Sequence, residues 1–274
     1  MMKKTLFIHS VVMAMALFLS SCSKVDITGR NQFIVVPDSF LTSMSLKQYD
    51  EFLKENKVST NRAQTKKVKQ VGENIANAVK AYCKDRNIQS ELQNYEWEFN
   101  LIDSNQVNAW AMPGGKVAVY TGLLPVARTE AGLAVVIGHE IAHVFAKHGA
   151  ERMSQNMIVQ VGSIAIAKAL EEKPEATKKL FMASYGMGSQ VAFTLPYSRK
   201  HEKEADRLGL IFMAMGGYEP SVAVDFWQRM ADSSDGKKHP PEFLSTHPVS
   251  DTRIRLIRQN MSEAMDYYER FGKK

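Results

Sequence analysis

The sequence contains the stretch Gly138-His139-Glu140-Ile141-Ala142-His143 directly after the apolar run 131–137. The length and composition of that run predict a buried helix. If the helix continues through the stretch, His139 and His143 lie four residues apart and project from one face. A single divalent metal can sit between the two imidazoles at Zn–N distances of roughly 2.0–2.1 Å. The spacing therefore predicts a site for one zinc ion per chain.

Glu140 lies one residue further round the same predicted helix. There its carboxylate can hold and deprotonate a metal-bound water without itself binding the metal, which is the arrangement of zinc peptidases. The alternative is a solvated helix that carries two surface histidines. That alternative fits poorly, because Ile141, Ala142 and residues 144–146 keep the segment apolar, and polar groups within an apolar helix need partners.

The flanks of this helix carry capping signals. Thr129 is placed to be its N-cap, and Gly149 is placed to end it. His148 is then expected to be a cation of the last turn or a surface residue, and not a metal ligand. A further helix over residues 153–171 is rich in Met, Ile, Val and Ala. Packing in the core is favoured for it, over lining a cleft or touching a membrane.

A second group of candidate side chains lies in residues 197–206. Two histidines leave a catalytic zinc one protein ligand short, and a glutamate from a later helix commonly supplies it. Glu202 and Asp206 share a helix face, so one can bind the metal while the other orients a ligand histidine. Glu204 is expected to be a solvated charge, and His201 a surface residue or one of secondary importance to the site. Taken alone, the segment is typical of an exposed helix, but the upstream histidine pair favours the ligand interpretation.

Residues 95–120 show the patterns of β structure. Residues 95–101 alternate apolar with polar side chains, and residues 108–112 and 116–120 flank Pro113-Gly114-Gly115, which predicts a hairpin. A strand edge near Asn108 and Ala109 can bind an extended polypeptide substrate through main-chain hydrogen bonds. The alternative, a hairpin that only closes a small sheet, is equally compatible with the sequence.

The N-terminal residues 1–21 have the pattern of an export signal. Lys3 and Lys4 precede an apolar core, residues 6–19, that is shorter than a typical transmembrane helix. The last residues before Cys22 are typical of a bacterial lipobox, in which Cys22 is acylated and becomes the first residue of the mature chain. An ordinary signal peptide cut nearby is the alternative. Acylated Cys22 would anchor the protein to a lipid membrane through a tether, residues 22–38.

The remaining residues, 39–274, are long enough to form one domain with a substantial core. Removal of Lys3 and Lys4 with the signal lowers the formal net charge from +6 to +4. Because this charge is mild and lacks a dense basic tract, nucleic acid is not expected as a partner. Cys83 is the one cysteine besides Cys22, so no internal disulfide framework is expected.

The combination of residues 139–143 with residues 202–206 resembles metallopeptidase family 48, which includes HtpX, BepA, LoiP and the Ste-type CAAX-prenyl proteases. The resemblance extends to shorter motifs along nearly all of the mature chain: Thr28-Gly29-Arg30, Asn108-Ala109, Met112-Pro113-Gly114-Gly115, Thr121-Gly122-Leu123 and His247-Pro248. It implies an α+β, mostly α, zincin (gluzincin) fold with a small β-sheet or hairpin beside the active-site helix. The lipobox places the chain nearer to the LoiP-like lipoprotein branch.

The family pattern also implies roles for particular residues. His139, His143 and Glu202 bind zinc in that pattern, Glu140 is the catalytic base, and Asp206 supports a ligand.

In the family pattern, a His-Pro pair is followed by four residues of any type and then by Arg. His247 and Arg253 match this pattern. His247 could stabilise the oxyanion of the reaction, or occupy the open zinc position as a latch in a resting state. Without the family match, it is equally a loop histidine beside a proline. Arg253 could anchor that loop or hold a carboxylate.

Together these features predict a membrane-anchored zinc endopeptidase of the bacterial cell envelope. It would be lipid-anchored in the outer membrane, face the periplasm, and hydrolyse peptide bonds in misfolded or damaged envelope proteins. The alternative is a latent or non-catalytic peptide-binding, chaperone-like lipoprotein in which His247 is a permanent fourth zinc ligand. The sequence leaves the oligomeric state open.

Overall fold

The computed structural model describes residues 22–25, 28–190, 195–233 and 241–272. The chain forms two compact units. Of the described residues, the larger unit comprises those within Asp38–His148 and from Ser198 onward, and the smaller unit comprises those up to Pro37 and within Gly149–Tyr197. The predicted export signal lies outside the described residues. The division into a tether at 22–38 and a domain at 39–274 stays a prediction.

A three-stranded sheet lies in the larger unit. Strands β3 (Glu98–Ile102), β4 (Ala109–Met112) and β5 (Lys116–Tyr120) stand in the order β3-β5-β4. β4 and β5 are antiparallel and form the predicted hairpin, with Ala111 opposite Val117, while β3 runs parallel to β5. Gly114 and Gly115 make the turn at φ values of 88° and 89°, which glycine adopts without strain.

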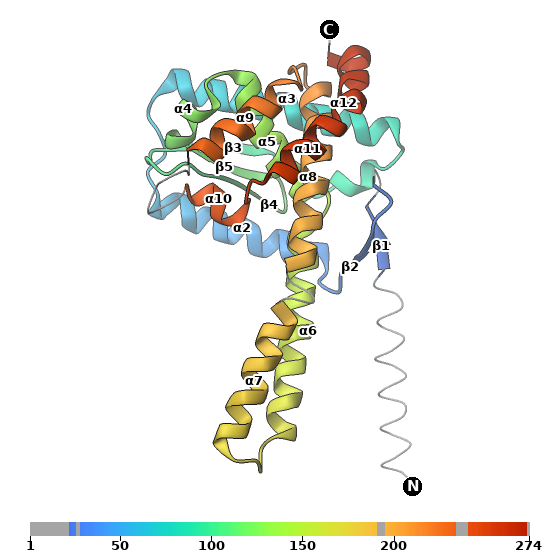
Figure 1. The fold of residues 1–274 in the computed structure, drawn as a ribbon. Coiled ribbons are helices and arrows are strands. Elements are labelled where there is room, and N and C mark those ends of the chain that lie inside the picture. The colour runs from blue at the N-terminus through green and yellow to red at the C-terminus, as the bar shows by residue number, and fades with distance from the viewer. Residues whose placement is uncertain (1–21, 26–27, 191–194, 234–240, 273–274) are drawn as a thin grey trace. The chain divides into compact units, whose positions relative to one another are not determined.

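Helices make up most of the larger unit, as the sequence predicts. Figure 1 shows α2 along one side of the sheet and α3 and α5 on the other. Tyr49 of α2 packs on Ile102 and Ala118 of the sheet, and its hydroxyl donates a hydrogen bond to the carbonyl of Val117 at 3.0 Å. The helices are α2 (Asp38–Glu55), α3 (Arg62–Asp85), α4 (Leu124–Ala127), α5 (Glu130–Phe145), α8 (Leu195–Met215), α9 (Val222–Asp232), α10 (Glu242–Thr246), α11 (Asp251–Gln259) and α12 (Met261–Tyr267), with short turns η1 (Gln89–Leu92), η2 (Thr121–Leu123) and η4 (Tyr268–Gly272).

Helix α5 is the buried centre of the larger unit. Every residue from Gly132 to Phe145 is buried, and the helix contacts α3, β4 and α9. Thr129 caps its N-terminus as predicted, because the hydroxyl accepts a hydrogen bond from the amide of Gly132 at 3.0 Å. The predicted end at Gly149 is wrong. The helix ends at Phe145, and Lys147, with φ 54°, turns the chain before the next helix begins at His148.

Helices α5 and α8 approach each other closely at two glycines. A Cβ atom added to Gly209 of α8 would lie 2.9 Å from the backbone nitrogen of His139, and a Cβ added to Gly138 of α5 would lie 3.0 Å from the carbonyl oxygen of Gly209. Both neighbours are backbone atoms, which cannot move aside as a flexible side chain can. The contact therefore fixes the distance between the helix that carries His139 and the helix that carries Glu202.

We expect Gly209→Ala to destabilise the metal-free protein by about 1–3 kcal/mol, because the added methyl group must push the two helices apart. The matched control is Gly186→Ala in the helix α7 (Glu175–Ser189), where a Cβ meets nothing within 4 Å. There alanine should stabilise the helix by about 0.5–1 kcal/mol. Urea unfolding measures both effects. Equal stability of the two variants would contradict the close contact.

The smaller unit combines a short sheet with a helical hairpin. Strands β1 (Cys22–Lys24) and β2 (Asn31–Phe33) are antiparallel, and α6 (His148–Ala169) and α7 form the hairpin. The guanidinium of Arg30 donates hydrogen bonds of 3.0 and 2.8 Å to the fully buried carboxylate of Glu151 in α6. A bidentate pair of this kind orients both side chains, so it holds the segment before β2 against the start of α6.

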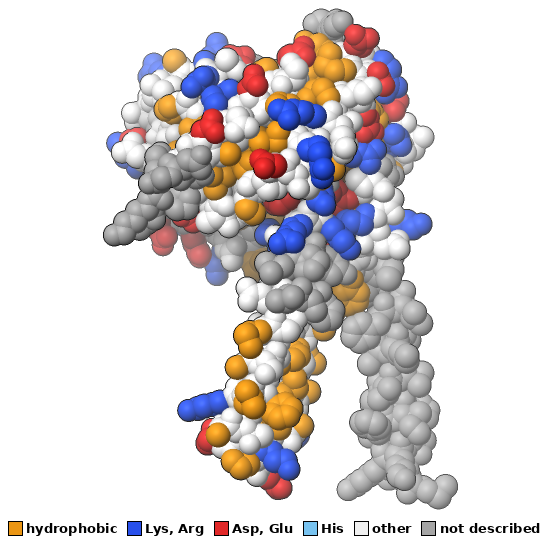
Figure 2. Space-filling view, in the orientation of Figure 1, with side chains coloured by type: hydrophobic (Ala, Val, Ile, Leu, Met, Phe, Trp, Pro, Cys, Tyr) orange, Lys and Arg blue, Asp and Glu red, His pale blue; other side chains and the backbone are white. Residues whose placement is uncertain are grey.

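The apolar side chains of the hairpin are largely exposed (Figure 2). Val161 and Ile164 of α6 are 67% and 68% exposed, and Leu180 of α7 is 66% exposed. Core packing, the favoured expectation for the predicted helix 153–171, is therefore wrong for Val161 and Ile164. Among the described residues, no single helix is long and apolar enough to cross a membrane. The bent pair Thr121–Ala127 and Glu130–Phe145, with an angle of 120°, meets that test by length and composition.

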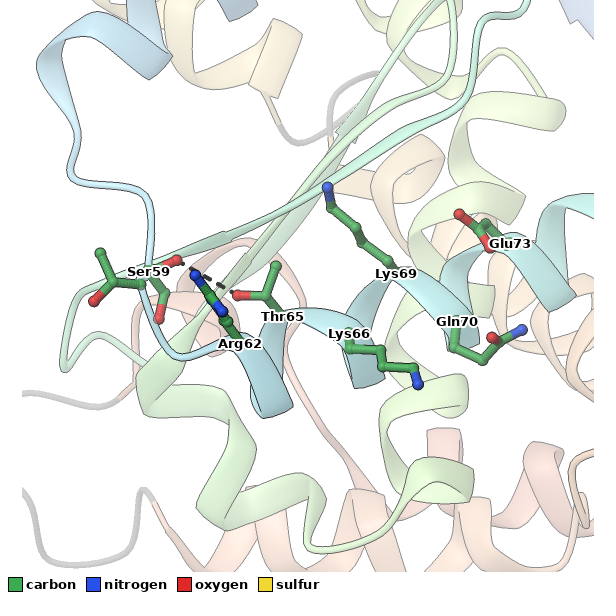
Figure 3. A pocket seen from close by; sticks show the side chains of 8 residues that line it. Ser59, Arg62, Thr65, Lys66, Lys69, Gln70 and Glu73 are labelled. Carbon is green, nitrogen blue, oxygen red and sulfur yellow. Dashed lines mark hydrogen bonds between the residues drawn. The ribbon is translucent and has the colours of Figure 1, made fainter.

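A surface hollow of about 730 Å³ lies along the first turns of α3 (Figure 3). Its lining is polar and contains none of the candidate site residues: Ser59, Thr60, Arg62, Thr65, Lys66, Lys69, Gln70 and Glu73.

Candidate metal centre

Four side chains from three parts of the larger unit converge on one point. His139 and His143 come from α5, Glu202 from α8, and His247 from the residue after α10. One donor atom from each lies within 4.8 Å of the other three. The predicted histidine pair and the predicted glutamate are therefore brought together, and His247 joins them.

The separations between the donor atoms suit a tetrahedral metal. His143 Nε2 is 3.0 Å from His139 Nε2, and each of these atoms is 3.3 Å from a Glu202 oxygen. The Nδ1 atom of His247 lies 3.3 Å from His139 Nε2 and 3.0 Å from Glu202. A tetrahedron with metal–ligand bonds of ~2.0–2.1 Å has edges of ~3.3 Å. Three imidazoles and one carboxylate at this spacing fit zinc.

The Glu140 carboxylate lies beside this donor group without belonging to it. It is 4% exposed, and its Oε1 atom is 3.4 Å from His247 Nε2. His247 thus faces Glu202 with one ring nitrogen and Glu140 with the other.

Asp206 and Arg253 support the donor group from behind. Asp206 Oδ1 lies 3.1 Å from His139 Nδ1, the ring nitrogen that faces away from the other donors. Arg253 donates two hydrogen bonds to Asp206, at 2.7 and 2.8 Å, and one to the backbone carbonyl of His247 at 3.2 Å. Its guanidinium stacks 3.7 Å from the ring centre of Trp227. Arg253 therefore contacts both a carboxylate and the His247 loop, the two partners that the sequence left open for it.

Electrostatics keep the carboxylates of the group charged. Although burial opposes ionisation, His143, His139 and His247 hold the pKa of Glu202 well below its usual range. Burial likewise opposes ionisation of Asp206, but Arg253 and His139 lower its pKa. Burial lowers the pKa of His143 to about 3. His143 is therefore neutral, with a ring nitrogen available to bind a metal.

The pKa of His139 moves in the other direction. Burial disfavours its charged form, yet hydrogen bonds to Asp206 and Glu202 raise its pKa to about 9. A metal that used this ring as a ligand would have to displace its proton.

Solvent exposure was the expectation for Glu204 and one of two expectations each for His148 and His201, and for all three residues exposure is wrong. His148 and Glu204 are 0% and 6% exposed, and their side chains lie 2.9 Å apart. His201 is also buried and stacks on His148, with ring centres 4.1 Å apart. The apolar continuation at Ala205 and Leu208 is the sequence signal that favoured burial of this segment.

Asn108 and Ala109 lie at the start of the outer strand of the three-stranded sheet. Ala109 pairs with Val119 of β5, and the Asn108 carbonyl accepts a hydrogen bond from the amide of Tyr120 at 3.1 Å. β4 pairs with β5 along one edge and is the last strand in the order β3-β5-β4. Its second edge has no strand partner among the described strands. Binding of substrate there stays a prediction.

The sequence pattern of peptidase family M48 matches residues 62–261 of this chain. The chain is 36% identical over 176 residues to the mitochondrial metalloendopeptidase OMA1 of Schizosaccharomyces pombe, over 64% of this chain and 50% of that protein. It is 30% identical over 174 residues to the beta-barrel assembly-enhancing protease of Yersinia pestis, over 61% of this chain and 35% of that protein.

Human OMA1, a mitochondrial metalloendopeptidase, is 27% identical over 247 residues, which cover 89% of this chain and 46% of the human protein. The chain thus spans half or less of the length of these relatives. The finer assignment to a LoiP-like branch stays a prediction. The region matched by the family pattern contains all the donors of the candidate metal centre, and the chain belongs to peptidase family M48.

Proposed function

We propose that this protein is a zinc-dependent endopeptidase that binds one zinc ion per chain. The observation that carries the proposal is the convergence of His139, His143, Glu202 and His247, with the Glu140 carboxylate beside them. Membership of a metallopeptidase family supports it. In the working state His139, His143 and Glu202 would hold the metal, which would leave one position for water and substrate.

The residues of the chain divide the chemistry between them. When bound, zinc supplies a Lewis acid that polarises the scissile carbonyl and lowers the pKa of water. Glu140 accepts the proton of the attacking water at its carboxylate and delivers it to the leaving amine nitrogen. The open edge of β4 near Asn108 holds the polypeptide extended through main-chain hydrogen bonds. Asp206 orients His139, and Arg253 holds Asp206 in place.

The test of endopeptidase activity is mass spectrometry of the products from an unfolded protein substrate. We expect fragments produced by cleavage at internal peptide bonds. Products trimmed one residue at a time from a chain end would contradict the assignment.

A second candidate is a latent or non-catalytic peptide-binding, chaperone-like protein, in which His247 completes the zinc site. The observation that favours this candidate is the position of His247 Nδ1, 3.0 Å from Glu202. A site with four protein ligands has no open position and is structural. The two candidates differ in whether His247 is a removable latch or a permanent ligand.

We expect His247→Ala to retain zinc, because three ligands remain, and to cleave an unfolded protein faster than wild type if His247 is a latch. If His247 instead stabilises the oxyanion, cleavage should fall by about 10²–10³-fold with zinc retained. Zinc content and cleavage rate measured together separate these roles. Loss of zinc together with loss of the folded state would support the structural candidate.

We further propose that the protein is a lipoprotein of the bacterial envelope, anchored in the outer membrane through acylated Cys22 and facing the periplasm. Its substrates would be misfolded or damaged envelope proteins. The lipobox supports the anchor. The name of the Yersinia relative, a beta-barrel assembly-enhancing protease, supports an envelope setting, whereas the OMA1 relatives are mitochondrial.

We expect Cys22→Ser to abolish lipid attachment and move the protein from the membrane fraction to the soluble fraction. Acyl chains contribute ~0.8 kcal/mol of membrane affinity per buried CH₂ group, so their loss should release most of the protein. Fractionation and intact-mass measurement check this, with Cys83→Ser as the matched control because Cys83 is fully buried. Membrane retention of Cys22→Ser would contradict the lipid anchor.

A further inference from the structure

We propose that Glu204 and His148 are positioning residues that fix the ring tautomer of His143 through two successive hydrogen bonds. The inference rests on the proposed zinc site and deepens it. It assigns a role to two buried residues that the proposed mechanism does not otherwise use.

The geometry connects the three side chains in line. His143 directs Nε2 toward His139 and Glu202, at 3.0 and 3.3 Å, so Nε2 is its metal-binding atom. Its other nitrogen, Nδ1, lies 2.8 Å from Nδ1 of His148. On the far side of that ring, Nε2 of His148 lies 2.9 Å from Oε2 of Glu204.

With a neutral His148, the protons of these two hydrogen bonds can be assigned in one direction. A carboxylate only accepts hydrogen bonds, so His148 donates its Nε2–H to Glu204. A neutral imidazole has one N–H, which leaves Nδ1 of His148 as an acceptor. That acceptor receives the Nδ1–H of His143, and the lone pair on His143 Nε2 is left to bind the metal. Glu204 therefore sets the tautomer of a ligand that it does not touch.

The arrangement parallels the support of the other ligand histidine on α5. Asp206 contacts His139 Nδ1 directly at 3.1 Å, whereas Glu204 reaches His143 through an intervening imidazole. Both acids come from α8, which also carries Glu202. The His148 ring is held in place by His201, which stacks on it at an angle of 16° between the planes.

The experiment is a zinc-affinity measurement on the metal-free full chain by competition with a chelator. Loss of a group that orients a ligand histidine typically weakens metal affinity ~10–100-fold. We expect a loss in that range for His148→Leu, which has no acceptor. His148→Asn should recover most of it, because Asn Oδ1 can accept the hydrogen bond in place of Nδ1. Lys203→Gln, an exposed charge change on the same helix, should leave affinity unchanged.

The coupling between the two residues gives a second, independent readout. Glu204→Leu should weaken zinc affinity in the wild-type background and have little further effect in the His148→Asn background, because the imidazole that links Glu204 to His143 is gone. This comparison remains available if His148→Leu does not fold. A purely structural role of Glu204 would give equal losses in both backgrounds.

Three results would overturn the inference: wild-type affinity in folded His148→Leu, no recovery in His148→Asn, or equal effects of Glu204→Leu in both backgrounds. Absence of zinc binding by the wild type is a different outcome, because it would contradict the proposed function itself.

Discussion

Replacement of Glu140 by glutamine is expected to abolish peptide cleavage while about one zinc per chain remains bound. The amide has nearly the same shape as the carboxylate but cannot accept the proton of the attacking water. Glu140 is not one of the four converging donors, so the metal site should stay intact. A missing general base costs typically 10²–10⁴-fold in rate. Zinc content and cleavage of an unfolded protein are to be measured on the same preparation.

The matched control is Glu96→Gln, because the Glu96 side chain is 85% exposed and makes one long ion pair, of 4.0 Å, with Lys116. It should keep wild-type activity. Cleavage at the wild-type rate in Glu140→Gln would contradict the role of Glu140 as base. Loss of zinc in that variant would show instead that Glu140 takes part in metal binding.

The second large effect is expected from His139→Ala, which should lose both zinc and cleavage. His139 is 1% exposed, and its Nε2 atom lies within 3.3 Å of donor atoms of His143, Glu202 and His247. Its removal takes away one of the three proposed ligands and leaves Asp206 without the ring that it orients. Elemental analysis after dialysis measures the zinc, and circular dichroism verifies that the variant is folded.

The result for His139→Ala bears both on the ligand set and on the need for metal in cleavage. Unchanged zinc stoichiometry in the folded variant would contradict the assignment of His139 as a ligand. Zinc loss with retained cleavage would contradict the metal-dependent mechanism.

Local patterns predicted the parts of the fold that depend on short-range spacing. The Thr129 cap, the hairpin around Gly114 and the shared face of His139 and His143 follow from the chain within a few residues. The approach of Glu202 was inferred from the incomplete ligand set of the histidine pair, whereas that of His247 required the resemblance to a known family. Spacing within one segment does not predict that the segments carrying Glu202 and His247 fold against the helix that carries His139.

The surface assignments of His148, Glu204 and His201 failed for a physical reason. The sequence pattern extended the metal-binding helix to Gly149, which would have placed His148 on a solvated last turn. The left-handed residue Lys147 instead ends the helix early and directs His148 back toward His143. Glu204 then has a buried partner from a distant segment. A charged run on one helix does not reveal such a partner.

The smaller unit shows a second limit of prediction from the sequence. Apolar composition predicted core packing for residues 153–171, but composition does not state how much partner surface the fold provides. Val161 and Ile164 are more than two-thirds exposed.

The most direct test of the proposed zinc peptidase is the zinc dependence of cleavage by the wild-type chain. Zinc is removed by a chelator and dialysis, and then restored in measured amounts while cleavage of an unfolded protein is followed. We expect no cleavage without metal and full recovery at about one equivalent of zinc per chain. Undiminished cleavage by the zinc-free protein would contradict the proposed metallopeptidase mechanism.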